Sequence, residues 1–144
     1  MLMLVRIGIS QMTTPIPVPP LPARRDLAGP ALRAFFNLAA AWGLSADQER
    51  RLLGMPGRST YFRWKKERAG AVPHDVIERI SYLLGIYKAL HLLFPDDAQA
   101  DGWLRRPNDA PLFGGRSALE RMLGGQVADL YVVRQYLDAQ RGWG

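Results

Sequence analysis

A run of apolar residues at helical spacing, bounded by Pro73 and Pro95, constrains the fold of this chain more than any other feature. Between the two prolines, apolar side chains recur every three or four residues, the spacing that places them on one face of an α-helix. They are Val76, Ile77, Ile80, Leu83, Leu84, Tyr87, Leu90 and Phe94. Because proline is tolerated in the first turn of a helix and ends one elsewhere, the run predicts a single helix about 33 Å long. A helix of that length can join two halves of a 144-residue chain, and we expect it to be the spine of the fold.

Three shorter helices are expected before this spine. The first covers residues 29–43 and opens at Gly29-Pro30, with its apolar side chains on one face. The second begins at the capping-box sequence Ser45-Ala46-Asp47-Gln48 and closes near Gly54, and the third runs from about Arg58 to Arg68 with Ser59 as its cap. Two short helices joined by a tight turn and packed on an amphipathic helix form the plan of a helix-turn-helix, whose second short helix enters the DNA major groove.

Shorter elements follow the spine. A short helix is expected near residues 98–105, and residues 107–115 are expected to be irregular. The capping-box sequence Ser117-Ala118-Leu119-Glu120 predicts another helix. Four apolar residues mark the last helix: Val127, Leu130, Val133 and Leu137. Because no segment alternates β-branched side chains as a strand would, we predict an all-α fold, with a helix-turn-helix N-terminal domain joined by the long helix to a small helical C-terminal domain.

The start of the chain has a different composition. Five prolines lie between Thr13 and Pro22, which removes backbone donors and favours a flexible, extended arm. The apolar stretch at residues 1–9 has roughly half the length that a membrane-spanning helix needs, so no membrane association is expected. Met12 is an alternative start to Met1. The expected parts are a proline-rich arm over residues 1–28, the helix-turn-helix domain over 29–94 and the C-terminal domain over 95–144.

Positive charge is concentrated around the predicted third helix. The chain carries a formal charge of +6, and residues 44–70 hold seven basic against three acidic residues. A local cationic block of this kind is typical of polyanion binding, although it also fits an unliganded basic surface helix. We predict that Arg58 reads guanine and that the hydroxyl groups of the serine, threonine and tyrosine that follow it contact phosphates or base edges. The remaining basic residues of the helix are expected to neutralise phosphates. The predicted set is Arg58, Ser59, Thr60, Tyr61, Arg63, Lys65 and Lys66. RNA is less favoured, because no aromatic β-sheet platform is present in the pattern.

Catalysis and metal binding are not expected. The chain has no cysteine, which excludes disulfides and thiolate metal sites and favours a reducing cytoplasm. Its two histidines, His74 and His91, have no partner at a metal-ligand spacing, and no nucleophile elbow, P-loop or dinucleotide fingerprint occurs. The acidic residues Asp96, Asp97 and Asp101 are expected to cap helices and solvate a loop. We therefore predict a protein that is not an enzyme and has no catalytic residue, no metal site and no cofactor.

The last forty or so residues contain a more specific pattern. Trp-Leu-x-x-Pro-Asn at 103–108 is followed by Phe-x-Gly-x-Ser-Ala-Leu at 113–119 and by a final helix ending Val133-Arg134-x-Tyr136-Leu137-Asp138-Ala139-x-Arg141-Gly142. This order resembles the C-terminal toxin-binding domain of Xre/MbcA/ParS-type antitoxins. The upstream helix-turn-helix resembles the Xre-like DNA-binding domain of the same family, so the resemblance runs from about Gly29 onward.

The resemblance implies an antitoxin of a type II toxin–antitoxin pair. Its expected partner is a toxin of the RES fold, an enzyme that degrades NAD⁺, and its C-terminal end is expected to insert at the toxin active site. Repression of its own promoter as a homodimer is also implied. The implied toxin contacts are Leu137, Asp138, Gln140, Arg141, Gly142, Trp143 and Gly144. Among them, Arg141 suits a pocket built for phosphates or carboxylates, and Trp143 suits an apolar anchor.

Other residues of this half have structural explanations. Trp103 and Phe113 are expected to clamp the loop onto the core, Asn108 to bridge the loop backbone, and Gly114 and Gly115 to supply positive φ angles. A different function also remains open: a stand-alone helix-turn-helix transcriptional regulator, or an adaptor whose C-terminal half binds another protein.

Overall fold

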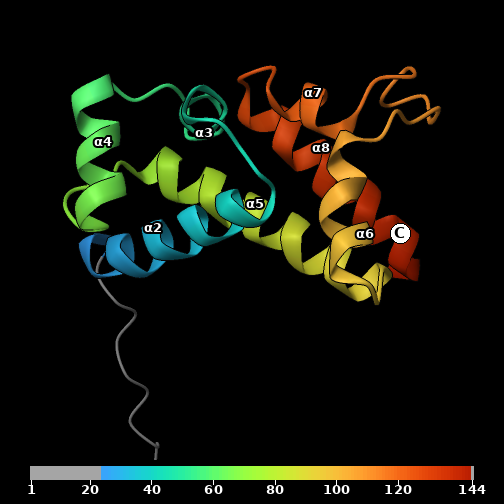
Figure 1. Ribbon diagram of the computed structural model, residues 1–144, viewed down its shortest axis with the longest axis horizontal. Coiled ribbons are helices and arrows are strands. Elements are labelled where there is room, and N and C mark those ends of the chain that lie inside the picture. Colours follow the sequence, from blue (N-terminus) through green and yellow to red (C-terminus); the bar gives the residue numbers. More distant parts are fainter. Residues whose placement is uncertain (1–23, 144) are drawn as a thin grey trace, which may run out of the picture.

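The computed structural model describes residues 24–143, which form an all-helical protein, as predicted (Figure 1). Its elements are α2 (Arg24–Ala41), α3 (Ala46–Leu52), α4 (Arg58–Glu67), α5 (His74–Leu93), α6 (Asp97–Gly102), the 3₁₀-helix η1 (Trp103–Arg105), α7 (Ala118–Met122), α8 (Val127–Asp138) and the π-helical turn η2 (Ala139–Trp143). The β pairing found in this part of the chain is an isolated bridge between Pro107 and Ser117.

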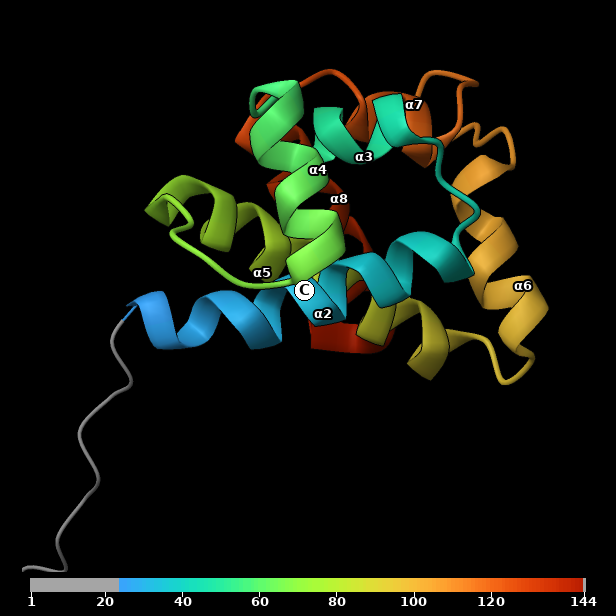
Figure 2. The same cartoon turned by 60° about the vertical axis from the view of Figure 1, so that its left-hand side comes forward.

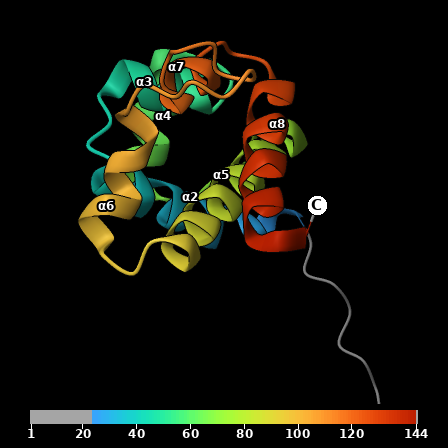
Figure 3. The ribbon, with the colours of Figure 1, turned by 90° about the vertical axis from the view of Figure 1, so that its right-hand side faces the viewer.

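Helix α5 is the spine that the sequence predicts. It follows Pro73 as N-cap and ends at Leu93, and its buried side chains fall at the expected helical spacing. It packs against α2 of the N-terminal half and against α8 of the C-terminal half, and Figure 3 shows α8 running alongside it. The guanidinium of Arg134 from α8 lies directly over Gly85. A Cβ atom at this position would lie only 2.5 Å from the nearest guanidinium atoms. Glycine therefore lets α8 approach the spine closely.

Helix α2 begins earlier than predicted. The sequence predicts a start at Gly29-Pro30, whereas the helix begins at Arg24 and carries Pro30 inside it. Packing explains the difference, because Ala28 is buried and joins Leu32 in the core, which stabilises the turn before the proline. Proline costs this helix one backbone donor, a loss that tertiary contacts can offset. Within the predicted arm, residues 24–28 are thus helical, and residues 1–23 lie outside the described part.

The helix-turn-helix consists of α3, a turn and α4, and α4 packs against α2 (Figure 2). The predicted capping box of α3 is present, with the Ser45 hydroxyl accepting from the Gln48 N–H. In the turn, the guanidinium of Arg50 donates to the Pro56 carbonyl at 3.0 and 3.3 Å. Gly57, without a side-chain cap, precedes α4, so the prediction that Ser59 caps this helix is wrong. Ser59 lies inside the first turn, because α4 starts at Arg58.

The C-terminal half is held by caps and an aromatic cluster. The Asp96 carboxylate caps α6, and Ser117 and Glu120 form the predicted capping box of α7. Trp103 and Phe113 pack against Tyr136 of α8, with ring centroids 6.2 and 5.2 Å from the tyrosine ring. This cluster fixes the irregular loop on the core, as predicted.

The predicted turn residues of that loop are also confirmed. The Asn108 side chain accepts from the Ala110 N–H at 2.9 Å. Gly114 and Gly115 have φ angles of 58° and 85°, a region in which a side chain would be strained.

Arginine side chains connect the two halves. Arg79 of α5 donates to the Gly125 carbonyl at 2.9 Å and lies against Gly54 in the helix-turn-helix turn. Arg105 donates to the carbonyls of Trp42 and Gly43 at 2.9 Å each, which ties η1 to the end of α2. Together with one continuous hydrophobic core, these contacts make the two halves a single body.

Candidate functional site

Two candidate binding regions lie far apart on this body. In Figure 1, α4 lies at one end of the long axis, and the end of α8 with η2 lies at the other. Helix α4 carries the predicted DNA contacts, and the end of α8 with η2 carries most of the contacts that the resemblance implies for a toxin. The two regions therefore lie on separate surfaces of one body.

Helix α4 presents a basic outer face. Its exposed side chains Ser59, Phe62, Arg63 and Lys66 are spaced three and four residues apart, so they form one stripe along the helix. Arg58 is exposed at the start of the helix, and its guanidinium lies 5.8 Å from the centroid of the Phe62 ring. The helix holds four basic residues and one acid, Glu67, and its first turn has no acid. A positive helix face of this kind is suited to lie along a phosphate backbone.

A buried polar network, which we call the Glu49 cluster, fixes α4 on α3. It consists of Glu49, Tyr61 and Lys65. The Glu49 side chain is only 5% exposed, and its carboxylate accepts hydrogen bonds from the Tyr61 hydroxyl and, at 2.9 Å, from the Lys65 ammonium. Because the carboxylate is removed from water but paired with two donors, its burial is compensated. The cluster thereby sets which face of α4 is turned outward.

The same contacts shift two pKa values. Burial raises the pKa of Tyr61 above its ordinary value, and the hydrogen bond to Glu49 adds to the rise. The hydrogen bond to Glu49 raises the pKa of Lys65, whose ammonium form is stabilised by the carboxylate, against a smaller opposing effect of burial. At neutral pH the tyrosine is therefore protonated and the lysine charged, which is the state in which both donate to Glu49.

Tyr61 was predicted to contact DNA, and this prediction is wrong. Its side chain is 0% exposed and packs beside Phe36, with ring centroids 6.2 Å apart. The tyrosine ring falls on the same side of α4 as buried Trp64, three residues on, and this spacing was the signal in the sequence that indicated a core position. Sequence reasoning also missed Glu49, because nothing local shows that an acid on α3 faces the core.

The other predicted DNA contacts differ in exposure. Arg58, Ser59, Arg63 and Lys66 are exposed, and Thr60 is half-buried beside Trp64 and Pro73. Lys65 keeps 43% of its side chain exposed, but its charge is partly neutralised by Glu49. The structure thus brings four of the seven predicted residues to the outer face and uses two others in the Glu49 cluster.

The end of α8 and η2 form the second region. The Asp138 carboxylate lies between two guanidinium groups, 3.7 Å from Arg134 Nε and 3.6 Å from Arg141 Nη1. The Arg141 side chain is largely buried and is turned back toward α8. Gln140 is exposed, as is Gly142, where a φ of 83° breaks the helical backbone.

One of the implied toxin contacts is placed in the core. Leu137 is 1% exposed, so the expectation that it contacts a partner directly is wrong. It continues the apolar stripe of α8 through Leu130 and Val133, which packs on α5. The side chain of Trp143 and the whole of Gly144 lie outside the described residues.

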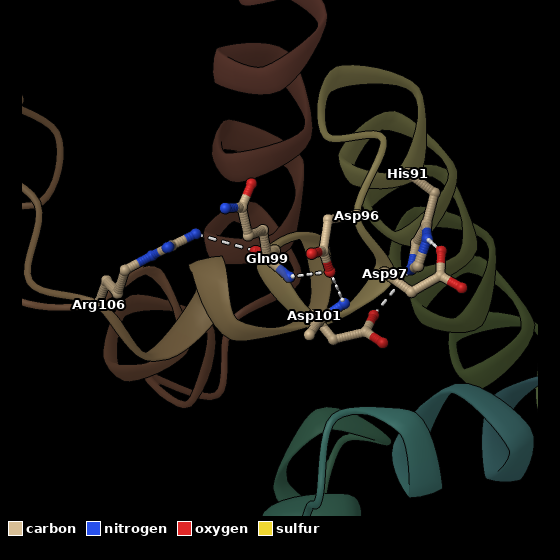
Figure 4. Close-up of polar contacts among 7 residues, drawn as sticks. His91, Asp96, Asp97, Gln99, Asp101 and Arg106 are labelled. Atoms are coloured by element: carbon tan, nitrogen blue, oxygen red, sulfur yellow. Dashed lines mark hydrogen bonds and ion pairs between the residues drawn. The ribbon is translucent and has the colours of Figure 1, made fainter.

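His91 is not the isolated histidine that the sequence indicates. Its ring lies between two carboxylates, with Nδ1 3.1 Å from Asp97 and Nε2 2.7 Å from Asp101 (Figure 4). The ring also packs on Tyr87, whose pKa is raised by burial and by the two nearby carboxylates. Of the three acids predicted to cap helices, Asp96 does so and the other two bind this histidine. Sequence spacing could not show this, because α6 must first fold back against α5.

Neither a metal centre nor a membrane span is found in the described part. No three side chains among the histidines and acids of residues 24–143 are grouped so that they could hold a metal ion. Over the same residues, every helix is too short or too polar to cross a membrane.

Comparison with known proteins gives two domain matches and a close relative. Residues 22–85 match the antitoxin Xre-like helix-turn-helix domain, and residues 89–142 match the antitoxin Xre/MbcA/ParS C-terminal toxin-binding domain. Both are binding domains, in agreement with the expectation that the chain is not an enzyme. The chain is also 58% identical over 111 residues to the uncharacterized protein y4oB of Sinorhizobium fredii, in an alignment that covers 77% of this chain and 84% of that protein. The two domain matches meet inside α5, the helix that both halves share.

Proposed function

This chain belongs to the Xre/MbcA/ParS family of antitoxins, and from that premise we propose that it neutralises a RES-domain toxin that degrades NAD⁺ and represses its own promoter. The observation that carries the proposal is the placement of the basic face of α4 and the end of α8 with η2 at opposite ends of one body (Figure 1). Such an arrangement leaves the DNA surface open while a toxin is held.

In the proposed DNA complex, α4 lies in the major groove. Arg58 reads a base edge from the start of the helix, and Ser59 contacts a phosphate or a base. Arg63 and Lys66 pair with phosphates, and these electrostatic contacts supply affinity without sequence preference. The stripe on which these residues lie supports this orientation. We expect the protein to act beside the chromosome, in the cytoplasm.

In the proposed toxin complex, the end of α8 and the residues that follow it enter the active site. Arg141 is the proposed contact, because its guanidinium can pair in bidentate fashion with a carboxylate of the toxin active site or with a phosphate of NAD⁺ bound there. To reach that site the side chain would exchange Asp138, 3.6 Å away, for one of these groups. The i, i+3 pair with Asp138 holds the largely buried Arg141 side chain against the end of α8, so the proposed complex requires its release from that pair.

Deletion of residues 141–144 tests the toxin arm of the proposal. The truncated protein retains α8 and the core, so promoter binding serves as its control for folding. Cells that express the adjacent reading frame together with the full chain should grow and keep their NAD⁺, whereas the truncated chain should fail to protect them. Protection by a truncated chain that also binds its promoter would refute insertion of the C-terminal end.

A homodimer is part of the proposal, since operators read by a helix-turn-helix are usually bound by dimers. An apolar groove between α2 and α5 supports it, with Leu27 40% exposed at its edge and Ala34, Ile77 and Leu84 along its walls. A stand-alone regulator or adaptor is the competing function, and it predicts that even the full chain does not protect the cells, because no toxin is bound.

A further inference from the structure

A small apolar pocket opens beside the end of α8, and we call it the tail pocket. Its volume is about 270 Å³. Its walls come from the end of α5, from η1 and from the junction of α8 with η2. The lining residues are Leu93, Phe94, Trp103, Tyr136, Leu137 and Gln140. Five of these six residues are apolar or aromatic, and the sixth, Gln140, is the exposed polar group of the set.

The walls of the tail pocket are held in place from behind. Trp103 stacks on Tyr136 with an interplanar angle of 20°, and Phe113 meets both rings edge-on. Leu137 is fully packed in the core. The pocket is therefore formed before any partner arrives, and a group that enters it pays little for reorganisation of the walls.

We propose that the tail pocket anchors one apolar or aromatic side chain of the toxin, as a contact separate from the C-terminal end. This inference rests on the proposed function. A volume near the lower edge of the roughly 300–1,000 Å³ typical of small-molecule sites suits a single large side chain better than a cofactor. Buried apolar anchors in preformed pockets are the contacts that dominate protein interfaces.

Two observations identify the toxin as the occupant. All six lining residues fall within residues 89–142, the segment that matches the toxin-binding domain. Gln140 also belongs to η2, so a partner that grips the residues after α8 must lie over the mouth of the pocket. Helix α4 and η2 lie at opposite ends of the long axis (Figure 1), and because Gln140 of η2 lines the pocket, the pocket stays accessible when DNA is bound at α4.

Two neighbouring leucines of α5 provide a matched test. Leu93 lines the pocket, whereas Leu92 is 57% exposed and does not. Leu93→Trp places a large ring in the pocket, and Leu92→Trp adds the same ring outside it. The probe is the purified product of the adjacent reading frame, and its affinity for each full-length variant is measured by calorimetry. Leu93→Ala, which enlarges the pocket instead of filling it, is the second variant.

We expect Leu93→Trp to weaken toxin binding by about 30-fold or more, in the range of interface hot spots. Leu93→Ala should weaken it by about tenfold, and Leu92→Trp by less than about threefold. Promoter binding should stay unchanged in all three, which verifies folding.

The possible contrary results separate this inference from the proposed function. If both Leu93 variants bind the toxin as tightly as the original chain while deletion of residues 141–144 abolishes binding, the tail pocket is not a toxin contact but the proposed function stands. If the unaltered chain does not bind the adjacent-frame protein, both are refuted. A change in the self-association of Leu93→Trp with unchanged toxin affinity would assign the pocket to a second copy of the chain and overturn the inference.

Discussion

Removal of the Tyr61 hydroxyl tests the network that fixes α4 on α3. In Tyr61→Phe the ring still fills its place beside Phe36, but the Glu49 carboxylate, 5% exposed, loses one of its two donors. A hydrogen bond to a charged group contributes about 1.5–3 kcal/mol, and the acceptor left here is buried, so we expect the free energy of unfolding to fall by about 2–3 kcal/mol. Lys65, which is partly exposed to solvent, still pairs with Glu49 in this variant. The loss of stability should therefore be smaller than the loss caused by a buried charge that has no partner at all.

The assay is thermal or urea unfolding followed by circular dichroism. A loss of this size lowers the melting temperature by roughly 5–10 °C for a chain of this length. Tyr131→Phe is the matched control, since its hydroxyl is on an exposed ring and pairs with exposed Gln135 at 2.7 Å. We expect the control to change stability by less than about 0.5 kcal/mol. Equal stability of Tyr61→Phe and Tyr131→Phe would refute the conclusion that the buried network stabilises the position of α4.

Three further predictions concern charge, pH and assembly. Replacing Arg63 and Lys66 together by Ala should reduce the slope of log K for promoter binding against log salt concentration by about 2. The slope is measured by titrating labelled DNA at several salt concentrations, and an unchanged slope would contradict contacts between these two residues and phosphates. The pKa values of Tyr61 and Lys65 are raised in the folded state, so the folded protein binds these two protons more tightly than the unfolded chain does. The free energy of unfolding, measured by urea unfolding, should therefore keep this contribution at neutral pH and lose it above about pH 10. A rise in the free energy of unfolding above that pH would contradict the shifts. Ser81 lies in the groove between α2 and α5, so Ser81→Arg should convert a dimer to a monomer, as measured by light scattering. Asn37 is exposed on α2 outside the groove, and Asn37→Arg should leave the dimer intact. If Ser81→Arg remains a dimer, the dimer interface lies elsewhere.

Residue patterns close together in the sequence predict most of the helices correctly. Apolar spacing between two prolines defined α5, and the pairs Ser45 with Gln48 and Ser117 with Glu120 defined two helix starts. Each of these signals acts over three or four residues, a distance at which backbone geometry alone brings side chains together. The start of α2 was misplaced because it depends on burial of Ala28, which is a tertiary effect.

Site residues were predicted less well, because polar side chains take their roles from distant partners. Tyr61 meets Glu49 across 12 positions, and Arg79 meets Gly125 across 46. For Tyr61 the three-residue spacing to Trp64 indicated the core, whereas the basic residues around it indicated DNA. Only the placement of α3 against α4 decides between the two.

The sequence alone thus determined the all-α class, the helix-turn-helix, the long connecting helix and the resemblance to a family of antitoxins. These follow from local periodicity, caps and short motifs, whose physical effects extend over one or two turns of the backbone. The tertiary structure decided which faces are exposed: it buried Tyr61 and Leu137, placed His91 between two carboxylates and formed the tail pocket. Those outcomes depend on how whole helices pack on α5, because burial and desolvation are set by contacts between segments far apart in the chain.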